Sequence, residues 1–128
     1  MAEPALVGIV DDDESLCKAL KRHLQSVGLR AETFGSAEEF IRSPHFPYTA
    51  CLILDVVMPG LSGLDLQRNL VAGNQSIPII FITAHDEENA RKQALELGAV
   101  AFLRKPVSGQ ALVSTINSVL DHGPGGSR

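Results

Sequence analysis

Acidic side chains stand at the ends of two apolar stretches of this sequence. Asp55 directly follows the uninterrupted run Cys51 to Leu54, and Asp11 to Asp13 directly follow an earlier run that ends at Val10. A charge at the end of a buried strand is costly unless it is paired, bound to a metal or placed at the mouth of a sheet. Carboxylates gathered at one such mouth repel one another and favour a cation. A small set of oxygen ligands with room for water and phosphate oxygens suits Mg²⁺.

Two further polar residues follow apolar stretches in the same way. Thr83 comes directly after the run that ends at Ile82, and Lys105-Pro106 lies two residues beyond Leu103. Taken alone, a threonine after a strand is most often a turn residue, and a lone surface lysine carries no information. A lysine beside the acidic cluster, however, would pair with a carboxylate or a phosphate. The proline also allows a cis peptide bond.

The stretches that would position these residues alternate between two patterns. Continuous apolar runs are typical of strands buried on both faces, and apolar residues spaced three or four apart are typical of helices. Strands are expected at 5–10, 30–34, 51–54, 77–82 and 100–103. Helices are expected after each strand, with inward residues Leu16, Leu20, Leu24, Val27, Phe40, Leu66, Leu70, Val71, Ala90, Ala94, Leu97, Leu112, Ile116 and Val119. Expected caps are Asp13, Ser36 with Glu39, Ser62 with Asp65, Asp86 and Ser108 at helix starts, and Gly28 and Gly98 at helix ends.

Alternating strands and helices predict an α/β fold. We expect a flavodoxin-like, doubly wound, five-stranded parallel sheet of order 2-1-3-4-5 with five helices. In that order the first and third strands are neighbours at the switch point where open sheets bind ligands. The carboxylates of Asp11, Asp12 and Asp55 would then come together, while Asp13 is used as the helix cap.

Length and composition limit the classes of protein to which this sequence can belong. At 128 residues the chain predicts one domain, expected over 1–122, with a glycine-rich tail or linker at 123–128. A net charge of −4 argues against direct nucleic-acid binding by this chain. No apolar stretch approaches the roughly 20 residues of a membrane span, and the N-terminus does not resemble a signal peptide. Cys17 and Cys51 lack metal-like spacing and are interpreted as reduced thiols, so we expect a cytoplasmic location.

These motifs together resemble the receiver domain of two-component response regulators. The resemblance spans residues 5 to 121 and rests on Val10-Asp-Asp-Asp13, Leu54-Asp-Val-Val-Met-Pro-Gly60 with Ser62-Gly63, Phe81-Ile-Thr-Ala84, Gly98-Ala99 and Lys105-Pro106. The sequence is most similar to receivers that precede a helix-turn-helix output domain of the LuxR/FixJ type. The implied fold is CheY-like, which agrees with the sheet order inferred from the strands.

The resemblance implies a mechanism. Asp55 would accept a phosphoryl group from a phosphohistidine of a sensor histidine kinase. Mg²⁺, or Mn²⁺ in its place, would be held by Asp12 and Asp55 directly, by Asp11 through water and by the Val57 backbone carbonyl. Lys105, the Thr83 hydroxyl and the Ala84 amide would bind the phosphoryl oxygens. In this reading the protein is not an enzyme beyond its own phosphoryl transfer and slow autodephosphorylation.

The resemblance also implies how the signal leaves the site. Thr83 would move toward the phosphoryl group, and Phe102 would act as the aromatic switch residue. The fourth helix, fifth strand and fifth helix would then control homodimerisation or an output domain, through which transcription would be regulated. Val57 cannot orient a hydrolytic water, which predicts a long-lived phosphoryl group, although His85 lies near the same path.

Several alternatives stay open or are weak. The chain can be the regulatory part of a transcription factor or a stand-alone phosphorelay shuttle. A phosphatase of the haloacid dehalogenase kind needs a second acid two residues after its nucleophile, where this sequence has Val57. A nucleotide-binding protein would need a glycine-rich loop after a strand, and none is present. A degenerate receiver used only for docking would not need the complete set of aspartate, threonine and lysine.

Overall fold

The structure is a computed structural model that describes residues 5–84 and 88–122. The expected cap Asp86, the residue His85 and the tail 123–128 lie outside the described residues. Among the described helices none is long and apolar enough to cross a membrane.

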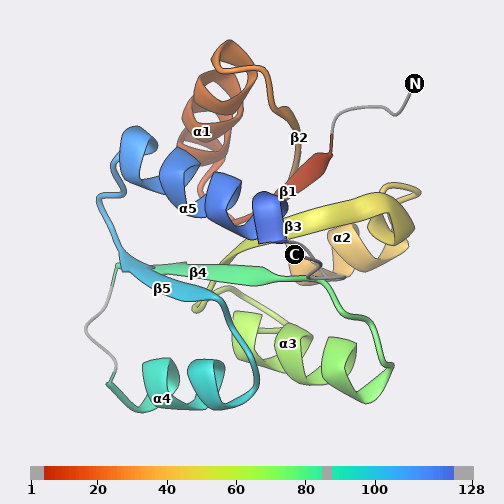
Figure 1. Cartoon of the computed structure of the whole chain (residues 1–128). Helices are drawn as coiled ribbons and strands as arrows, with labels where there is room; N and C mark the ends of the chain where they lie inside the picture. Colours follow the sequence, from red (N-terminus) through yellow and green to blue (C-terminus); the bar gives the residue numbers. More distant parts are fainter. Residues whose placement is uncertain (1–4, 85–87, 123–128) are drawn as a thin grey trace.

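A parallel sheet forms the centre of the molecule (Figure 1). Its strands are β1 (Leu6–Val10), β2 (Arg30–Phe34), β3 (Thr49–Asp55), β4 (Ile79–Thr83) and β5 (Ala101–Arg104). They are ordered β2-β1-β3-β4-β5, with every neighbouring pair parallel. The predicted topology is confirmed, and β1 and β3 are neighbours as expected.

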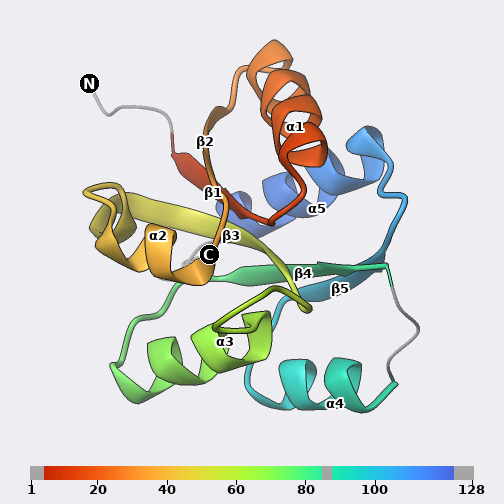
Figure 2. The same ribbon diagram turned by 180° about the vertical axis from the view of Figure 1, so that it is seen from behind.

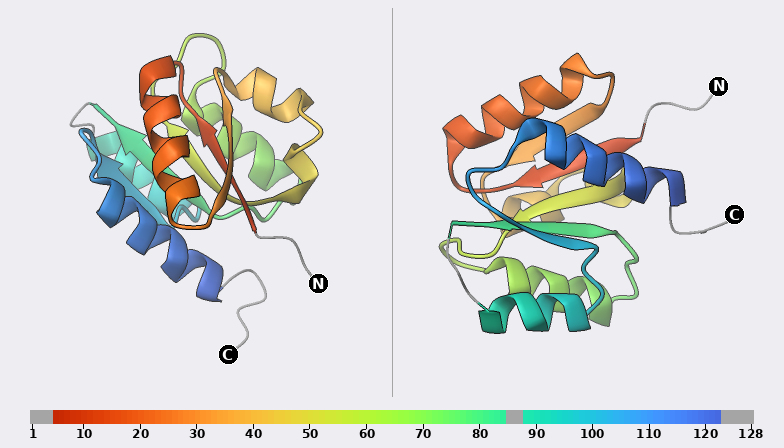
Figure 3. Two further views of the ribbon diagram at one scale, coloured as in Figure 1. Left: turned by 90° about the horizontal axis from the view of Figure 1, so that it is seen from above. Right: turned by 60° about the vertical axis from the view of Figure 1, so that its left-hand side comes forward.

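Helices cover both faces of this sheet. They are α1 (Glu14–Ser26), α2 (Ala37–Arg42), α3 (Gly63–Ala72), α4 (Glu88–Glu96) and α5 (Gly109–His122). Figures 2 and 3 show α1 and α5 on one face and α2, α3 and α4 on the other. The connection between α2 and β3 contains a short 3-10 helix, η1 (Phe46–Tyr48), with Pro47 inside it.

Each face of the sheet carries its own apolar core. Val7, Ile9 and Ile53 pack with α1 and α5, whereas the alternate residues Val10 and Leu54 pack with α2, α3 and α4. Alternation along a strand sends successive side chains to opposite faces, so a strand buried on both faces must be apolar throughout. The continuous apolar runs in the sequence have this cause.

Two residues predicted to face the core do not. Val27 is 49% exposed because it is the residue that ends α1, where the backbone has already left the helix. Val71 is 48% exposed in the last turn of α3, and Gln67 is buried on that helix. The predicted left-handed glycines are confirmed, with φ of +88° at Gly28 and +101° at Gly98.

Candidate functional site

The carboxyl ends of four strands meet at one edge of the sheet, and backbone hydrogen bonds fix their relative heights. The Val56 amide donates to Ile82 at 3.2 Å, which sets the end of β3 against β4. The Lys105 amide donates to the Thr83 carbonyl at 2.7 Å, which sets the residue after β5 against the end of β4. The functional side chains therefore project from the continuation of the sheet itself rather than from long loops.

Three carboxylates lie together at this edge. Asp11, Asp12 and Asp55 each offer an oxygen, and these oxygens lie within 4.8 Å of one another. Asp11 is 1% and Asp55 5% exposed, whereas Asp12 is exposed. The predicted division among the aspartates is also visible, since Asp13 caps α1 by accepting from Leu16 N–H at 3.2 Å.

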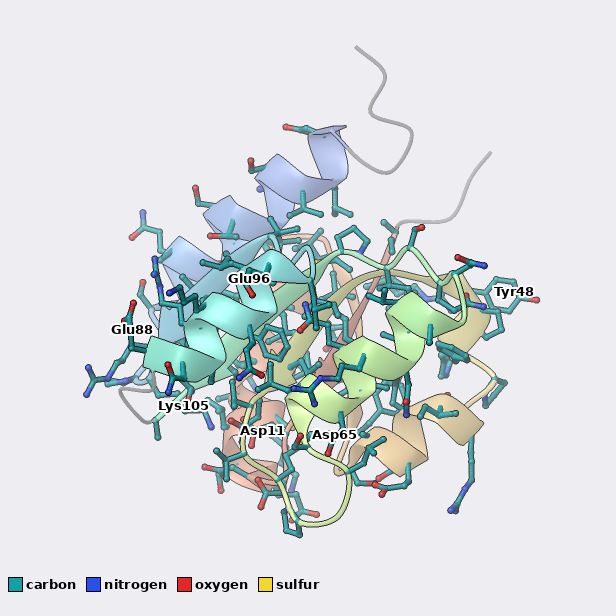
Figure 4. All side chains as sticks on the ribbon, turned by 90° about the horizontal axis from the view of Figure 1, so that it is seen from below. Asp11, Tyr48, Asp65, Glu88, Glu96 and Lys105 are labelled. Atoms are coloured by element: carbon teal, nitrogen blue, oxygen red, sulfur yellow. The ribbon has the colours of Figure 1, made fainter. Side chains whose placement is uncertain are left out.

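Lys105 supplies the opposite charge. Its Nζ lies 2.9 Å from Asp11 Oδ2 and 3.6 Å from Asp55 Oδ2. Figure 4 shows Asp11 and Lys105 at the same edge, with Tyr48 at the other side of the molecule. The Lys105–Pro106 peptide bond is cis. A single ammonium therefore compensates two buried carboxylates, which leaves the cluster with excess negative charge.

Burial and the neighbouring charges both shift pKa values in this cluster. Burial raises the pKa of Asp55 to about 6, and the neighbouring charge of Asp11 adds to the effect, while Lys105 and the Val57 N–H oppose it. Burial alone would lower the pKa of Lys105, but the carboxylates of Asp11 and Asp55 outweigh it and raise this pKa. A carboxylate with a raised pKa beside a firmly charged lysine is a feature of functional sites.

The loop after Asp55 is held close to the strand by a tight approach of α3. The Gly63 amide donates to the Val56 carbonyl at 3.0 Å. A Cβ at Gly63 would run into the Asp55 carbonyl, so only glycine fits there. Ser62 and Asp65 form the predicted capping box at the start of α3. Val57 is 48% exposed between these fixed points.

The predicted switch residues share one face of the sheet. Phe81 and Phe102 are register partners in β4 and β5, with ring centroids 5.8 Å apart. Thr83 lies two residues after Phe81, on the same side, and is 1% exposed at the end of β4. Phe102 is half-buried against the core beneath α3 and α4, and Ala84 is exposed.

Sequence reasoning missed two features of this edge. It gave Gly63 no specific role, although the Ser62-Gly63 pair marks the close helix approach. It also missed Glu38, whose carboxylate accepts from the Leu61 N–H at 3.1 Å. Because 23 residues separate the two partners, no local pattern signals this contact.

The donor set fits a hard divalent cation. All three side chains are carboxylates, two of them are buried, and their oxygens are close enough to share one ion. Oxygen-only ligands of this number suit Mg²⁺ better than metals that prefer nitrogen or sulfur.

The comparisons with known proteins agree with this geometry. The family model described as response regulator receiver domain matches residues 7–117. The chain belongs to the receiver domain family. The predicted family and CheY-like fold are thereby confirmed.

Two curated proteins and one solved structure are similar to this chain over most of its length. Nodulation protein W of Bradyrhizobium diazoefficiens is 46% identical over 112 residues, covering 88% of this chain and 49% of that protein. The transcriptional regulatory protein FixJ of Azorhizobium caulinodans is 32% identical over 120 residues, covering 94% of this chain and 57% of that protein. The crystal structure of FixJ-N superimposes with a TM-score of 0.82 at 32% identity, covering 95% of this chain and 97% of that one. This receiver thus spans about half the length of these two relatives.

Proposed function

We propose that Asp55 accepts a phosphoryl group from the phosphohistidine of a sensor histidine kinase. An Asp55 carboxylate oxygen would form the new P–O bond as the P–N bond to the histidine breaks, and the imidazole would leave with the bonding electron pair. The observation that carries the proposal is the burial of Asp55 at the end of β3, beside Asp11 and within 3.6 Å of the Lys105 ammonium. Phosphoryl transfer requires positioning and charge neutralisation more than covalent work by the protein.

Mg²⁺ is the metal that this donor set favours, with Mn²⁺ as a substitute. Asp12 and Asp55 would bind it directly, Asp11 through a water, and Val57 through its backbone carbonyl. When bound, the ion supplies charge neutralisation for the transferring phosphoryl oxygens. The bound ion would also offset the negative charges of Asp11 and Asp55, so Lys105 would no longer be needed in full to compensate them.

Lys105 is then available for the phosphoryl group. Its ammonium pairs with Asp11 and Asp55 in this structure and would shift to a phosphoryl oxygen carried by Asp55. The Thr83 hydroxyl and the Ala84 N–H would donate to the remaining oxygens. Charged donors and preorganised N–H groups are the usual means by which proteins stabilise such a group.

The switch would use the shared face of β4 and β5. When Thr83 moves toward the phosphoryl group, the space behind it becomes free for the half-buried ring of Phe102. The surface of α4, β5 and α5 would change with that ring and alter homodimerisation or contact with an output domain.

The relatives suggest the cellular process in which this receiver takes part. FixJ is named a transcriptional regulatory protein, and we infer that this receiver, over residues 1–122, also serves transcriptional regulation in the cytoplasm. A helix-turn-helix output part would bind the DNA, while this acidic chain would not. A stand-alone phosphorelay shuttle is the second candidate, and phosphoryl exchange with a histidine phosphotransfer protein would distinguish it.

The first experiment is labelling by a small phosphodonor such as acetyl phosphate. We expect Mg²⁺-dependent uptake of one phosphoryl group by the wild type, none after EDTA, and none by Asp55→Asn. Size exclusion before and after labelling reports dimerisation. Equal labelling of Asp55→Asn would contradict the proposal.

A phosphatase would behave differently. It would turn over p-nitrophenyl phosphate many times, whereas a receiver takes up one phosphoryl group. Because Val57 offers no polar atom in its side chain to orient water, we expect slow loss of the phosphoryl group. Val57→Asn should shorten its half-life, and an unchanged half-life would contradict this role of Val57.

A further inference from the structure

One side chain from outside the β3–α3 segment reaches the loop that follows Asp55. Glu38, on α2, lies 23 residues before Leu61, and its Oε2 accepts the Leu61 N–H at 3.1 Å. The same carboxylate lies against Gly60, whose φ is +76°, so that a Cβ there would stand 3.1 Å from Glu38 Oε2. The glycine thus lets the carboxylate approach the backbone of the loop closely.

This loop carries Val57, which acts on the site through its backbone. Val57 is the second residue after Asp55 and directly follows Val56, whose carbonyl accepts the Gly63 N–H. Under the proposed function, the Val57 carbonyl is a metal ligand. The orientation of this short peptide segment would therefore affect how the site binds the metal.

The two ends of the loop are fixed by hydrogen bonds of its own segment, and Met58 between them is buried in the core. The Gly63 amide holds the Val56 carbonyl at one end, and the capping box holds Ser62 at the other. Between them, the 3.1 Å bond from Leu61 to Glu38 ties the tip to a different element of the fold. An acceptor with negative charge is well suited to this place because the positive end of the α3 dipole lies beside it.

We propose that Glu38 is a positioning residue for the metal and phosphoryl site. It acts by holding the Gly60–Leu61 tip, and through the tip it fixes the orientation of Val57. The inference rests on the proposed function, because it concerns the affinity of that same site for Mg²⁺. Groups that orient metal ligands without touching the metal commonly change affinity by about tenfold or more.

The test compares three variants that separate this role from ordinary helix stability. Glu38→Ala removes the acceptor, Glu38→Gln keeps an acceptor oxygen of the same reach, and Glu38→Asp withdraws the carboxylate by one methylene. Glu39→Ala is the matched control, because Glu39 is the next residue of α2 and its Oε1 accepts the Gly35 N–H at 2.9 Å, away from the loop. Binding of Mg²⁺ is measured by calorimetry, amide exchange at Leu61 by NMR, and the labelling rate with acetyl phosphate.

We expect Glu38→Ala and Glu38→Asp to weaken Mg²⁺ binding by about tenfold and to speed amide exchange at Leu61. Glu38→Gln should restore Mg²⁺ binding to within about twofold of wild type, a rescue that a purely electrostatic role would not give. Glu39→Ala should leave Mg²⁺ binding unchanged even where it lowers stability. The labelling rate should follow Mg²⁺ binding across the series.

Two results would overturn the inference. One is a Glu38→Ala protein that binds Mg²⁺ as tightly as wild type; the other is an equal loss in Glu39→Ala. A failure of the proposed function looks different, because the wild type itself would then bind no Mg²⁺ and take up no phosphoryl group. Should Glu38→Ala prove too unstable to measure, Glu38→Asp and Glu38→Gln carry the same comparison.

Discussion

The central strand β3 and the outermost strand β5 differ in how deeply their side chains are buried. In β3 the residues Cys51 to Asp55 are all at most 5% exposed, and Gly63 packs directly against the end of the strand. In β5 the first three residues are half-buried and Arg104 is exposed, and α4 buries only Ala90 and Ala94 among its described side chains. A close-packed region tolerates little displacement, whereas a region held by small side chains can shift at low cost. The contrast places Asp55 in the region least able to move, and Phe102, one of the two proposed switch residues, in a region that can shift.

The largest difference is expected between the two neighbouring phenylalanines, Phe81 and Phe102, whose rings are tilted by 36° to each other. Phe81 is fully buried, so Phe81→Ala should cost about 3–5 kcal/mol of unfolding free energy. Phe102→Ala should cost less than half of that, because its ring is only half-buried, and should leave the labelling rate nearly unchanged. It should also weaken phosphorylation-dependent dimerisation. Urea unfolding and size exclusion measure both effects, and loss of labelling in Phe102→Ala would count against its switch role.

A second comparison disrupts the packing at the centre of the sheet by substituting Gly63. Gly63→Ala should cost about 1–3 kcal/mol, since the added Cβ meets the Asp55 backbone carbonyl, which cannot rotate away. Gly109→Ala is the matched control, because Gly109 also begins a helix but its added Cβ would meet the His23 ring, a side chain that can turn aside. Equal losses of stability in urea would show that the approach of α3 to β3 is not special.

The buried charge of Asp55 predicts a pH dependence of stability in the metal-free protein. Its folded pKa of about 6 lies above the ordinary aspartate pKa of 3.8, so the folded state holds the proton more tightly than the unfolded state does. Stability should therefore fall as pH rises from about 4 to about 6 and stay lower above it. Asp55→Asn should remove this fall and be more stable than wild type by about 2–3 kcal/mol at pH 7. Urea unfolding in EDTA at several pH values tests it, and equal stabilities at pH 7 would contradict it.

The smallest effect on stability is expected at the contact between α3 and α4. Gln67 is 1% exposed, and its Nε2 donates to the Ala94 carbonyl at 2.9 Å, while its Oε1 has no hydrogen-bond partner in the described part of the chain. Gln67→Leu removes a bond and an unpaired acceptor together, so stability should change by less than about 1 kcal/mol. Amide exchange in α4 should nevertheless become faster.

The control for this change is Arg68→Ala. Arg68 bonds to the Gln93 side chain at 2.8 Å in a solvent-exposed position, where hydrogen bonds contribute little. Its effect on exchange in α4 should be smaller than that of Gln67→Leu. The reverse order would mean that the buried bond does not restrain α4.

The sequence predicted the parts of this fold that depend on periodicity. Apolar runs predicted four of the five strands, β2 being the exception with its sequence Arg-Ala-Glu-Thr-Phe, and polar residues at the strand ends predicted Asp11, Asp55, Thr83 and Lys105 at one edge. Helical spacing was less reliable at helix ends, where Val27 and Val71 fit the period but lie outside the packed interface. Period alone cannot tell whether a last turn still contacts the sheet.

Outside the acidic cluster, the side-chain contacts between distant segments were not predicted from the sequence. Gln67 is a polar residue at a core position, and a hydrophobic pattern predicts such a residue to be exposed. Glu38 belongs by its local sequence to the first turn of α2, and its bond to Leu61 arises only when α2 and α3 pack on the same face. The distances between Lys105 and the two aspartates likewise depend on the assembled sheet.

The central claim concerns which atom carries the phosphoryl group, and one measurement locates it directly. After labelling with acetyl phosphate and Mg²⁺, borohydride reduces an aspartyl phosphate to homoserine, which peptide mass spectrometry assigns to a single residue. The account predicts homoserine at position 55 only, and none in samples kept in EDTA. Homoserine at position 11 or 12, or an unmodified Asp55 in protein that has taken up phosphoryl groups, would contradict it.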